Sequence, residues 1–247
     1  MSGLPSYRGF RDRSVESALY GVLQRRFLNE PKECDRVVGD LLAELLPGRD
    51  DVRLLDVGCG NGQTLRYLER GFTHFKNGDR VGWRLTGIDI RPEAVSESDG
   101  TVELADLFDY DPGGFRDVIV CQSVTYAFTD EQFSEALARF RSWLAPGGLV
   151  ILFDMFTPWE QHLTVVERSL HHPDGHLLMV RPYSQLREVA SSTGFGVLEI
   201  RPFSFKGGRH WADPHDLRSY DQGGLTAGLT MRGCFNQPQA HAVLVAV

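Results

Sequence analysis

The chain has 247 residues, of which 42% are hydrophobic and 24% are charged, so it can bury a sizeable core. Its formal net charge of -7 gives no general attraction to a phosphate backbone, and nucleic acid is not expected as a partner. The four cysteines form no CxxC pair, which disfavours a disulfide framework or a structural zinc site. No signal peptide and no apolar run of roughly 20 residues is apparent, so we expect a cytoplasmic protein without membrane contact.

Short apolar runs typical of strands alternate with longer helical patterns, which predicts an α/β fold with a mostly parallel sheet covered by helices. The expected strands are Val52 to Val57, Arg84 to Ile90, Val102 to Ala105, Asp117 to Gln122, Gly148 to Asp154, Gly196 to Arg201 and His241 to Val247. The expected helices cover about residues 14 to 28, 31 to 46, 62 to 70, 130 to 144, 158 to 170 and 183 to 193. At this length the strands fit one sheet in a single domain.

Two helix boundaries carry local signals. Thr157-Pro158-Trp159-Glu160 reads as a capping box with proline at the first helical position, which predicts the start of the helix over 158 to 170. Ala145-Pro146-Gly147-Gly148 ends the preceding helix and turns the chain into the next strand.

Two long connections fall outside a minimal alternating core. One runs from Phe72 to Trp83, and the other runs from Phe203 to Gln239 and is rich in glycine, arginine, histidine and aromatic residues. Long connections in a compact domain are more often functional than idle, so the second is a candidate binding element.

A glycine-rich turn follows the first expected strand, with glycines at positions 58, 60 and 62. Bare backbone N–H groups and the positive end of a helix approach a ligand closely at such a turn. A phosphate-binding P-loop needs a lysine after its last glycine, but Gln63 and Thr64 follow here. A dinucleotide-binding turn needs its third glycine at position 63, which is Gln63, so both of these ligand classes are disfavoured.

LDVGCGNG, residues 55 to 62, closely resembles the first motif of the class I S-adenosylmethionine-dependent methyltransferases. The resemblance implies that Gly58 and Gly60 let the loop pass against the methionine moiety and that Asp56 helps to hold its amino group. An acid at this position suits a ligand with ammonium and sulfonium charges and would repel a pyrophosphate. S-adenosylmethionine is therefore the expected cofactor, and a glycine turn used only for tight packing is the alternative.

Two further motifs match the same family. In LTGIDIRPEA, Asp89 takes the position of the acid that accepts both ribose hydroxyls, and Ile90 would pack on the adenine; a helix N-cap before the proline is the alternative role of Asp89. In VELADLFDY, Asp106 and Leu107 take the position that reads the adenine amino group.

The resemblance covers residues 52 to 154 well and 183 to 201 loosely. It implies a Rossmann-like seven-stranded sheet in the order 3-2-1-4-5-7-6, with the last strand antiparallel and helices on both faces. Gln122 ends the fourth strand and is included among the cofactor-binding residues; because it is an amide, we expect a metal-independent enzyme. The expected division is a helical cover (1–50), a cofactor-binding core (51–202), an acceptor-binding insertion (203–239) and the last strand (240–247).

Gln122-Ser123-Val124-Thr125 departs from the Asn/Asp-Pro-Pro-Tyr tetrapeptide of enzymes that methylate the amino groups of nucleic-acid bases. The expected partner is therefore a small-molecule methyl acceptor, with a sugar or natural-product hydroxyl favoured. Methylation of a small amine stays open, as does a protein that binds S-adenosylmethionine or S-adenosylhomocysteine without catalysis.

A hydroxyl acceptor needs a base, and histidine is the usual choice because its ordinary pKa lies near the working pH. His162 and His172 are the candidate catalytic residues, and exposure without function is the alternative for each. We expect the acceptor beside the fourth and fifth strands, under a cover made by the N-terminal helical region, residues 156 to 180 and the insertion.

Overall fold

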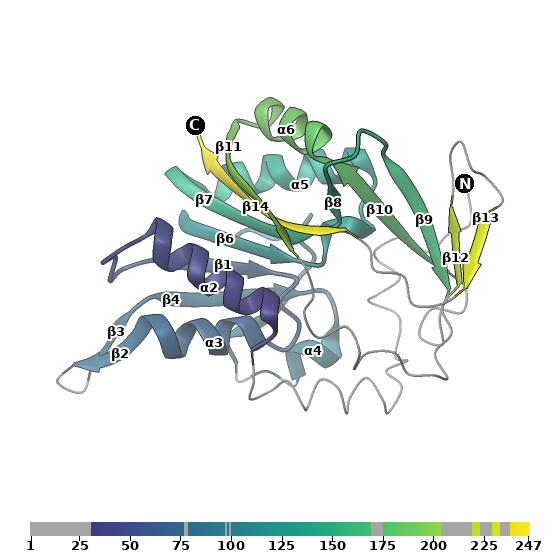
Figure 1. Ribbon diagram of the computed structural model, residues 1–247. Helices are drawn as coiled ribbons and strands as arrows, with labels where there is room; N and C mark the ends of the chain where they lie inside the picture. The colour runs from purple at the N-terminus through teal and green to yellow at the C-terminus, as the bar shows by residue number, and fades with distance from the viewer. Residues whose placement is uncertain are drawn as a thin grey trace.

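The computed structural model describes residues 31–76, 79–96, 98, 100–168, 175–203, 219–222, 229–232 and 238–247. A twisted sheet forms its centre, with helices on both faces and a second, smaller sheet to one side (Figure 1). The predicted helix over 14 to 28 lies outside the described residues.

Seven strands form the central sheet, in the order β11-β14-β7-β6-β1-β4-β5. Their bounds are β1 (Arg53–Val57), β4 (Arg84–Asp89), β5 (Val102–Leu104), β6 (Arg116–Gln122), β7 (Leu144–Asp154), β11 (Phe195–Phe203) and β14 (Gln239–Ala246). Counted along the chain, these strands are the seven predicted ones in the predicted order. The strand β14 pairs antiparallel with both β7 and β11, so the antiparallel last strand is confirmed.

Successive side chains of a strand point to opposite faces of the sheet, and in the central strands the side chains on both faces are apolar. In β1, Leu54 packs with the helices α2 (Glu33–Leu45) and α3 (Gln63–Phe72), while Leu55 packs on the opposite face. That opposite face is covered by α5 (Asp130–Trp143) and α6 (Tyr183–Ser192), and Figure 1 shows the two helix pairs on either side of the sheet. A strand that is buried on both faces explains the nearly continuous apolar runs in the sequence.

The second sheet replaces a predicted helix. It has the order β13-β12-β9-β10-β8, with β8 (Phe156–Thr157), β9 (Leu163–Arg168), β10 (His176–Pro182), β12 (Ser219–Gln222) and β13 (Leu229–Arg232). The helix predicted over 158 to 170 is therefore wrong. The hydroxyl of Thr157 accepts a hydrogen bond from the N–H of Trp159 at 3.2 Å, which makes a local turn in place of a helix cap. Beyond the turn, the β-branched LTVVER segment pairs with β10, and this pairing outweighs the local capping signal.

The connection from Phe72 to Trp83 is a hairpin of β2 (Thr73–Lys76) and β3 (Asp79–Gly82). The rings of Phe72 and Trp83 stack at its base with centroids 4.1 Å apart. The indole N–H of Trp83 donates to the carbonyl of Arg49 at 2.7 Å. The hairpin is thus fixed to the end of the sheet opposite the glycine turn, and a short helix α4 (Pro92–Ser96) follows β4.

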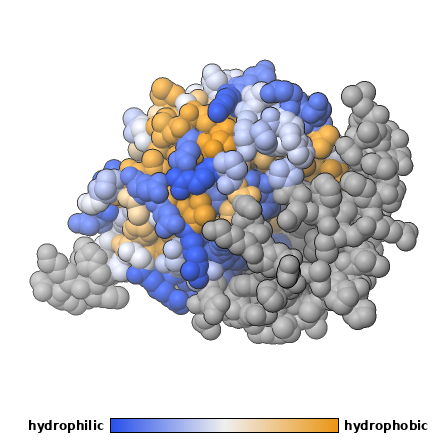
Figure 2. Space-filling view, in the orientation of Figure 1, coloured by the Kyte–Doolittle hydropathy of each residue, from blue (hydrophilic) through white to orange (hydrophobic). Residues whose placement is uncertain are grey.

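Figure 2 shows hydrophilic and hydrophobic side chains side by side over the described part of one face. This mixture fits helices that pack on the sheet along one side and meet water along the other. Within the described ranges, every helix is too short or too polar to cross a bilayer.

Candidate active site

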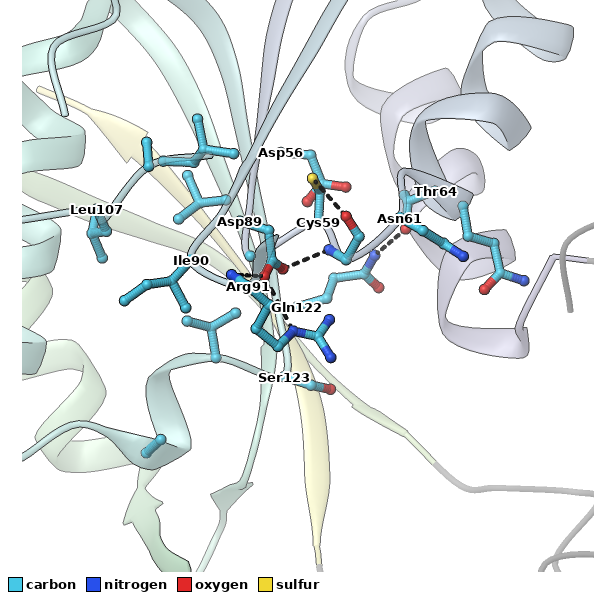
Figure 3. Close-up of a pocket in the computed structure, with 18 of the residues that line it drawn as sticks. Asp56, Cys59, Asn61, Thr64, Asp89, Ile90, Arg91, Leu107, Gln122 and Ser123 are labelled. Atoms are coloured by element: carbon cyan, nitrogen blue, oxygen red, sulfur yellow. Dashed lines mark hydrogen bonds and ion pairs between the residues drawn. The ribbon is translucent and has the colours of Figure 1, made fainter. Parts of the chain in front are cut away.

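A cavity of about 330 Å³ opens at the carboxyl ends of the parallel strands, where α/β sheets usually bind ligands. All of the residues predicted to bind the cofactor line it: Asp56, Gly58, Gly60, Asp89, Ile90, Asp106, Leu107 and Gln122. They come from four neighbouring strands and the loops after them, and Figure 3 shows several of them converging on one space. The roles of the individual side chains stay predictions.

The glycine turn approaches the cavity with a left-handed backbone. Gly58, Gly60 and Gly62 have φ angles of 71°, 58° and 81°, which other residues adopt with strain. A Cβ atom on Gly58 would overlap the side chain of Val124, which belongs to the loop after β6. Both the backbone angle and the close approach therefore require glycine at position 58.

The carboxylate of Asp89 is buried and already holds the turn in place. Its Oδ2 accepts the N–H of Gly60 at 2.8 Å, and its Oδ1 accepts the backbone N–H and the Nε of Arg91 at 2.9 and 3.1 Å (Figure 3). Each carboxylate oxygen has two lone pairs, so Oδ1 is fully used and Oδ2 keeps one. A diol that needs one acceptor from each oxygen would have to displace the Arg91 side chain from Oδ1.

Asp56 is a buried carboxyl group that lines the cavity. Its side chain is 2% exposed, and its Oδ2 has no hydrogen-bond partner among the described residues. Burial raises the pKa of this carboxyl well above its ordinary value, and the nearby charges of Asp35 and Asp89 raise it further. A positively charged group in the cavity would satisfy this oxygen and favour its ionised form.

The helix α2 adds a carboxylate that sequence reasoning missed. Asp35 is buried and its Oδ1 accepts the hydroxyl of Thr64 at 2.9 Å and the amide of Gln122 at 3.3 Å, while its Oδ2 accepts the N–H of Lys32 at 2.8 Å. The amide of Gln122 also donates to the Thr64 hydroxyl at 3.1 Å. The network ties α2 to the ends of β6 and α3 at the cavity. In the sequence, Asp35 is visible only as an acid in the first turn of an amphipathic helix. Acids are common at this position in ordinary helices, so the residue gives no sign of a site.

The adenine-reading residues proposed from the sequence lie together on the loop after β5. The side chain of Leu107 is buried, and the Oδ1 of Asp106 accepts the N–H of Phe108 at 3.0 Å in a local turn. Ile90, directly after β4, lines the cavity near Leu107 (Figure 3). The hydrogen bond between Asp106 and Phe108 fixes the shape of the loop, and with it the position of the backbone that borders the cavity.

The loop after β6 forms another wall of the cavity. Ser123 has a φ angle of 55°, which is rare outside glycine, and its N–H donates to the carbonyl of Phe153 at 2.7 Å. A short 3-10 helix, η2 (Thr125–Ala127), follows it. Val124, Tyr126 and Phe128 from this stretch line the cavity, so the strained residue turns the chain toward the ligand space.

Only one of the two histidines predicted as catalytic bases, His162, lies within the described residues. His162 is absent from the described cavity lining, and its Nδ1 lies 3.4 Å from Oδ2 of Asp130. Partial burial lowers the pKa of its imidazole; the charge of Asp130 opposes this lowering and that of Arg181 adds to it. His172 lies outside the described residues. The assignment of either histidine as a base stays a prediction.

Side chains of the types that bind metals are not grouped in the part of the chain that the structure describes. No three histidine, cysteine, aspartate or glutamate residues there could hold one ion. Metal independence therefore stays a prediction from the sequence.

Comparison with known proteins identifies the family. Residues 27–200 match the family described as "Methyltransferase domain". A dTDP-3-amino-3,4,6-trideoxy-alpha-D-glucopyranose N,N-dimethyltransferase from Streptomyces venezuelae is 27% identical over 198 residues, which are 79% of this chain and 80% of that protein. A demethylspheroidene O-methyltransferase from Rhodobacter capsulatus is 30% identical over 138 residues, 53% of this chain and 32% of that protein.

Solved structures share the fold. A magnesium protoporphyrin IX methyltransferase from Synechocystis, with bound S-adenosylmethionine, has a TM-score of 0.61 at 15% identity, and the match covers 100% of both chains. A sugar N-methyltransferase from a Streptoalloteichus species has a TM-score of 0.57 at 18% identity and covers 95% of each chain. With the family match over residues 27–200, the chain belongs to the class I S-adenosylmethionine-dependent methyltransferases, as its glycine turn predicted.

Proposed function

We propose that the protein transfers the methyl group of S-adenosylmethionine to an amino nitrogen of a small polar molecule, such as an amino sugar. The observation that carries the cofactor assignment is the buried Oδ2 of Asp56, which has no hydrogen-bond partner among the described residues and lies in a cavity that also contains the carboxylates of Asp35 and Asp89. S-adenosylmethionine carries an ammonium and a sulfonium charge, which suit this surrounding.

The residues present fit such a cofactor along the whole cavity. Gly58 and Gly60 line the cavity with a left-handed backbone that can pass close to the methionine part, and one lone pair of Asp89 Oδ2 is open to a ribose hydroxyl. Lys32 lines the same cavity and offers a positive charge to a carboxylate. When bound, the cofactor supplies a methyl group on a positively charged sulfur, which is a good leaving group.

The transfer step needs alignment more than acid or base catalysis when the acceptor is a neutral amine. The nitrogen lone pair attacks the methyl carbon in line with the carbon–sulfur bond. That bond breaks, its electron pair stays on sulfur, and the methylated amine then loses a proton to solvent or a nearby base. The wall formed by Ser123, Val124 and Tyr126 would hold the amine at the methyl carbon. Such alignment makes a reaction between two bound molecules effectively unimolecular, which lowers its barrier.

The relatives support an amine over the hydroxyl that the sequence favoured. The amino-sugar N,N-dimethyltransferase aligns with 79% of this chain, including residues beyond the cofactor-binding strands, whereas the O-methyltransferase aligns with 53% of it. A hydroxyl acceptor is the second candidate, and the 30% identity to that O-methyltransferase supports it.

A paired acceptor screen would test the proposal. Purified protein would first be analysed by mass spectrometry for retained S-adenosylmethionine or S-adenosylhomocysteine. Nucleotide-linked amino sugars would then be offered with methyl-labelled S-adenosylmethionine, each beside its control in which a hydroxyl replaces the amine. We expect labelled product with amines only. Labelling of the hydroxyl controls at a similar rate would contradict the proposal that the acceptor atom is an amine nitrogen. Bound cofactor with no product in any pair would favour a protein that binds the cofactor without catalysis.

A further inference from the structure

Arg181 is a buried guanidinium at the junction of the two sheets. It lies in β10 of the second sheet, is 1% exposed, and sits with its guanidinium carbon 4.5 Å from the ring centre of Phe133. Its Nη1 and Nη2 donate to the carbonyls of Thr125 and Phe128 at 2.9 and 2.6 Å, and its Nε donates to Asp130 at 3.1 Å. All three contacts fall on the six residues from Thr125 to Asp130.

A second buried charge holds the same segment from the central sheet. Asp154 ends β7 and is 2% exposed. Its Oδ2 accepts the hydroxyl of Thr125 at 2.7 Å and the N–H of Tyr126 at 3.0 Å, and its Oδ1 accepts the N–H of Met155 at 2.9 Å. Arg181 thus binds the carbonyl side of the segment while Asp154 binds its N–H and hydroxyl side.

The segment held in this way is a wall of the methyl-transfer cavity. Tyr126, Ala127 and Phe128 all line the cavity. Tyr126 also packs against the small apolar core of the second sheet, which is formed around Leu178 and Val180. A movement of β10 would therefore reach the cavity wall through both the guanidinium and the tyrosine.

The rest of the cofactor site is attached elsewhere. Asp56 is the second-last residue of β1 and Asp89 is the last residue of β4, and the contacts that hold Asp89 come from Gly60 and Arg91. Within the described part of the chain, none of the hydrogen bonds of the Arg181 side chain reaches these residues. The wall and the cofactor site can therefore be perturbed separately.

We propose that Arg181 is a positioning residue that fixes the 125–128 wall for the methyl acceptor and links the second sheet to the methyl-transfer step. The inference rests on the proposed function for its kinetic part only. A displacement reaction is sensitive to the placement of the nucleophile, and a shift of the order of 1 Å can lower its rate by about 100-fold. A merely stabilising arginine would instead lower the amount of folded protein and leave the rate per folded molecule unchanged.

The test compares Arg181→Ala and Arg181→Lys with Met179→Ala as the control. Met179 also lies in β10 and is 8% exposed, and its sulfur accepts the hydroxyl of Thr164 at 3.8 Å. Among the described residues, it is outside the small apolar core against which Tyr126 packs. For Arg181→Ala we expect single-turnover methyl transfer to fall by about 100-fold. Affinity for S-adenosylhomocysteine should stay within about threefold in calorimetry, and added methylguanidinium should restore transfer by about tenfold or more. Arg181→Lys keeps the charge without the planar fork, so we expect an intermediate rate; it serves as the readout if the alanine variant does not fold.

Hydrogen exchange on the S-adenosylhomocysteine-bound protein gives a readout that needs no acceptor. In the Arg181 variants the amides of residues 123–129 should exchange about tenfold faster, whereas Met179→Ala should leave them unchanged. Equal exchange in the Arg181 and Met179 variants, or a parallel loss of transfer and cofactor affinity, would overturn the proposal. Faster exchange with no methylation of any amine by the unmodified protein would leave Arg181 as the anchor of the wall and reject the proposed function.

Discussion

His241 provides a test of how burial controls stability as the pH falls. The imidazole lies in β14, is 1% exposed, and stacks on Phe153 with ring centroids 4.4 Å apart. Neither ring nitrogen has a hydrogen-bond partner among the described residues. Burial lowers its pKa from 6.5 to about 4; a carbonyl contact from Cys34 opposes the lowering, and the charge of Arg201 adds to it. The folded protein therefore resists protonation of this ring.

The sign of the effect follows from proton binding. Between pH 6.5 and 4 the unfolded chain binds a proton at this residue and the folded chain does not, so stability falls as the pH falls through this window. The pKa difference of about 2.5 corresponds to a maximum of about 3 kcal/mol, and between pH 7.5 and pH 5 the loss is about 2 kcal/mol. Above pH 7.5 the ring is neutral in both states and contributes no pH dependence.

The variant His241→Phe keeps a flat ring against Phe153 and removes the titrating group. Urea unfolding of both proteins at pH 7.5 and pH 5 gives the difference in unfolding free energy between the two pH values, in which the other titrating groups cancel. We expect the unmodified protein to lose about 2 kcal/mol more than the variant between these pH values. His162→Phe, at a partly exposed imidazole whose pKa is lowered in the same direction, is the comparison variant and should change this difference less than His241→Phe does. The same pH dependence in the unmodified protein and His241→Phe would refute the argument from burial.

Four further predictions concern cofactor binding and methyl transfer. Asp89→Asn should weaken binding of S-adenosylhomocysteine in calorimetry by about 1.5 to 3 kcal/mol, because hydrogen bonds to a charged acceptor are lost; unchanged affinity would remove Asp89 from the site. Gly58→Ala should abolish measurable cofactor binding or lower the unfolding temperature, because its Cβ overlaps Val124 and its φ is 71°; normal binding and melting would contradict that geometry. His162→Ala should lower single-turnover transfer less than tenfold, since an amine acceptor needs no histidine base; a loss of about 100-fold or more would restore His162 as the base. Activity should survive treatment with EDTA, and loss of activity with rescue by Mg²⁺ would show a metal requirement.

The central sheet and the residues that line the cavity at its edge could be predicted because their signals are local. Each parallel strand is a short apolar run, and the turn after β1 needs glycine at fixed positions for backbone reasons. The acids Asp56 and Asp89 lie within the last two residues of β1 and β4, so the same apolar runs place them. Since parallel strands place their carboxyl ends at one edge, residues 56, 89, 106 and 122 had to meet there once the strand order was known.

The second sheet could not be predicted in the same way because its pairing is not local. β9 pairs with β10 across the residues between 168 and 176, and with β12 across a much longer stretch. Thr157 and Pro158 gave a strong local signal for a helix, and only the partner strands decide against it. The role of Asp35 was missed for a related reason. Its partners Thr64 and Gln122 lie far along the chain, and no sequence pattern near Asp35 indicates that it contacts them.

The position of β14 has a consequence for how the molecule is made. This strand lies between β7 and β11, and its residues come after those of every other strand in the sheet. During synthesis, β11 has no neighbour in the central sheet until residues 239–246 have left the ribosome, and β7 keeps one edge unpaired for the same time. An unpaired, apolar strand edge is a site of aggregation. Production of this protein should therefore be more sensitive to truncation or slow translation of that late segment than to changes in the loops before it.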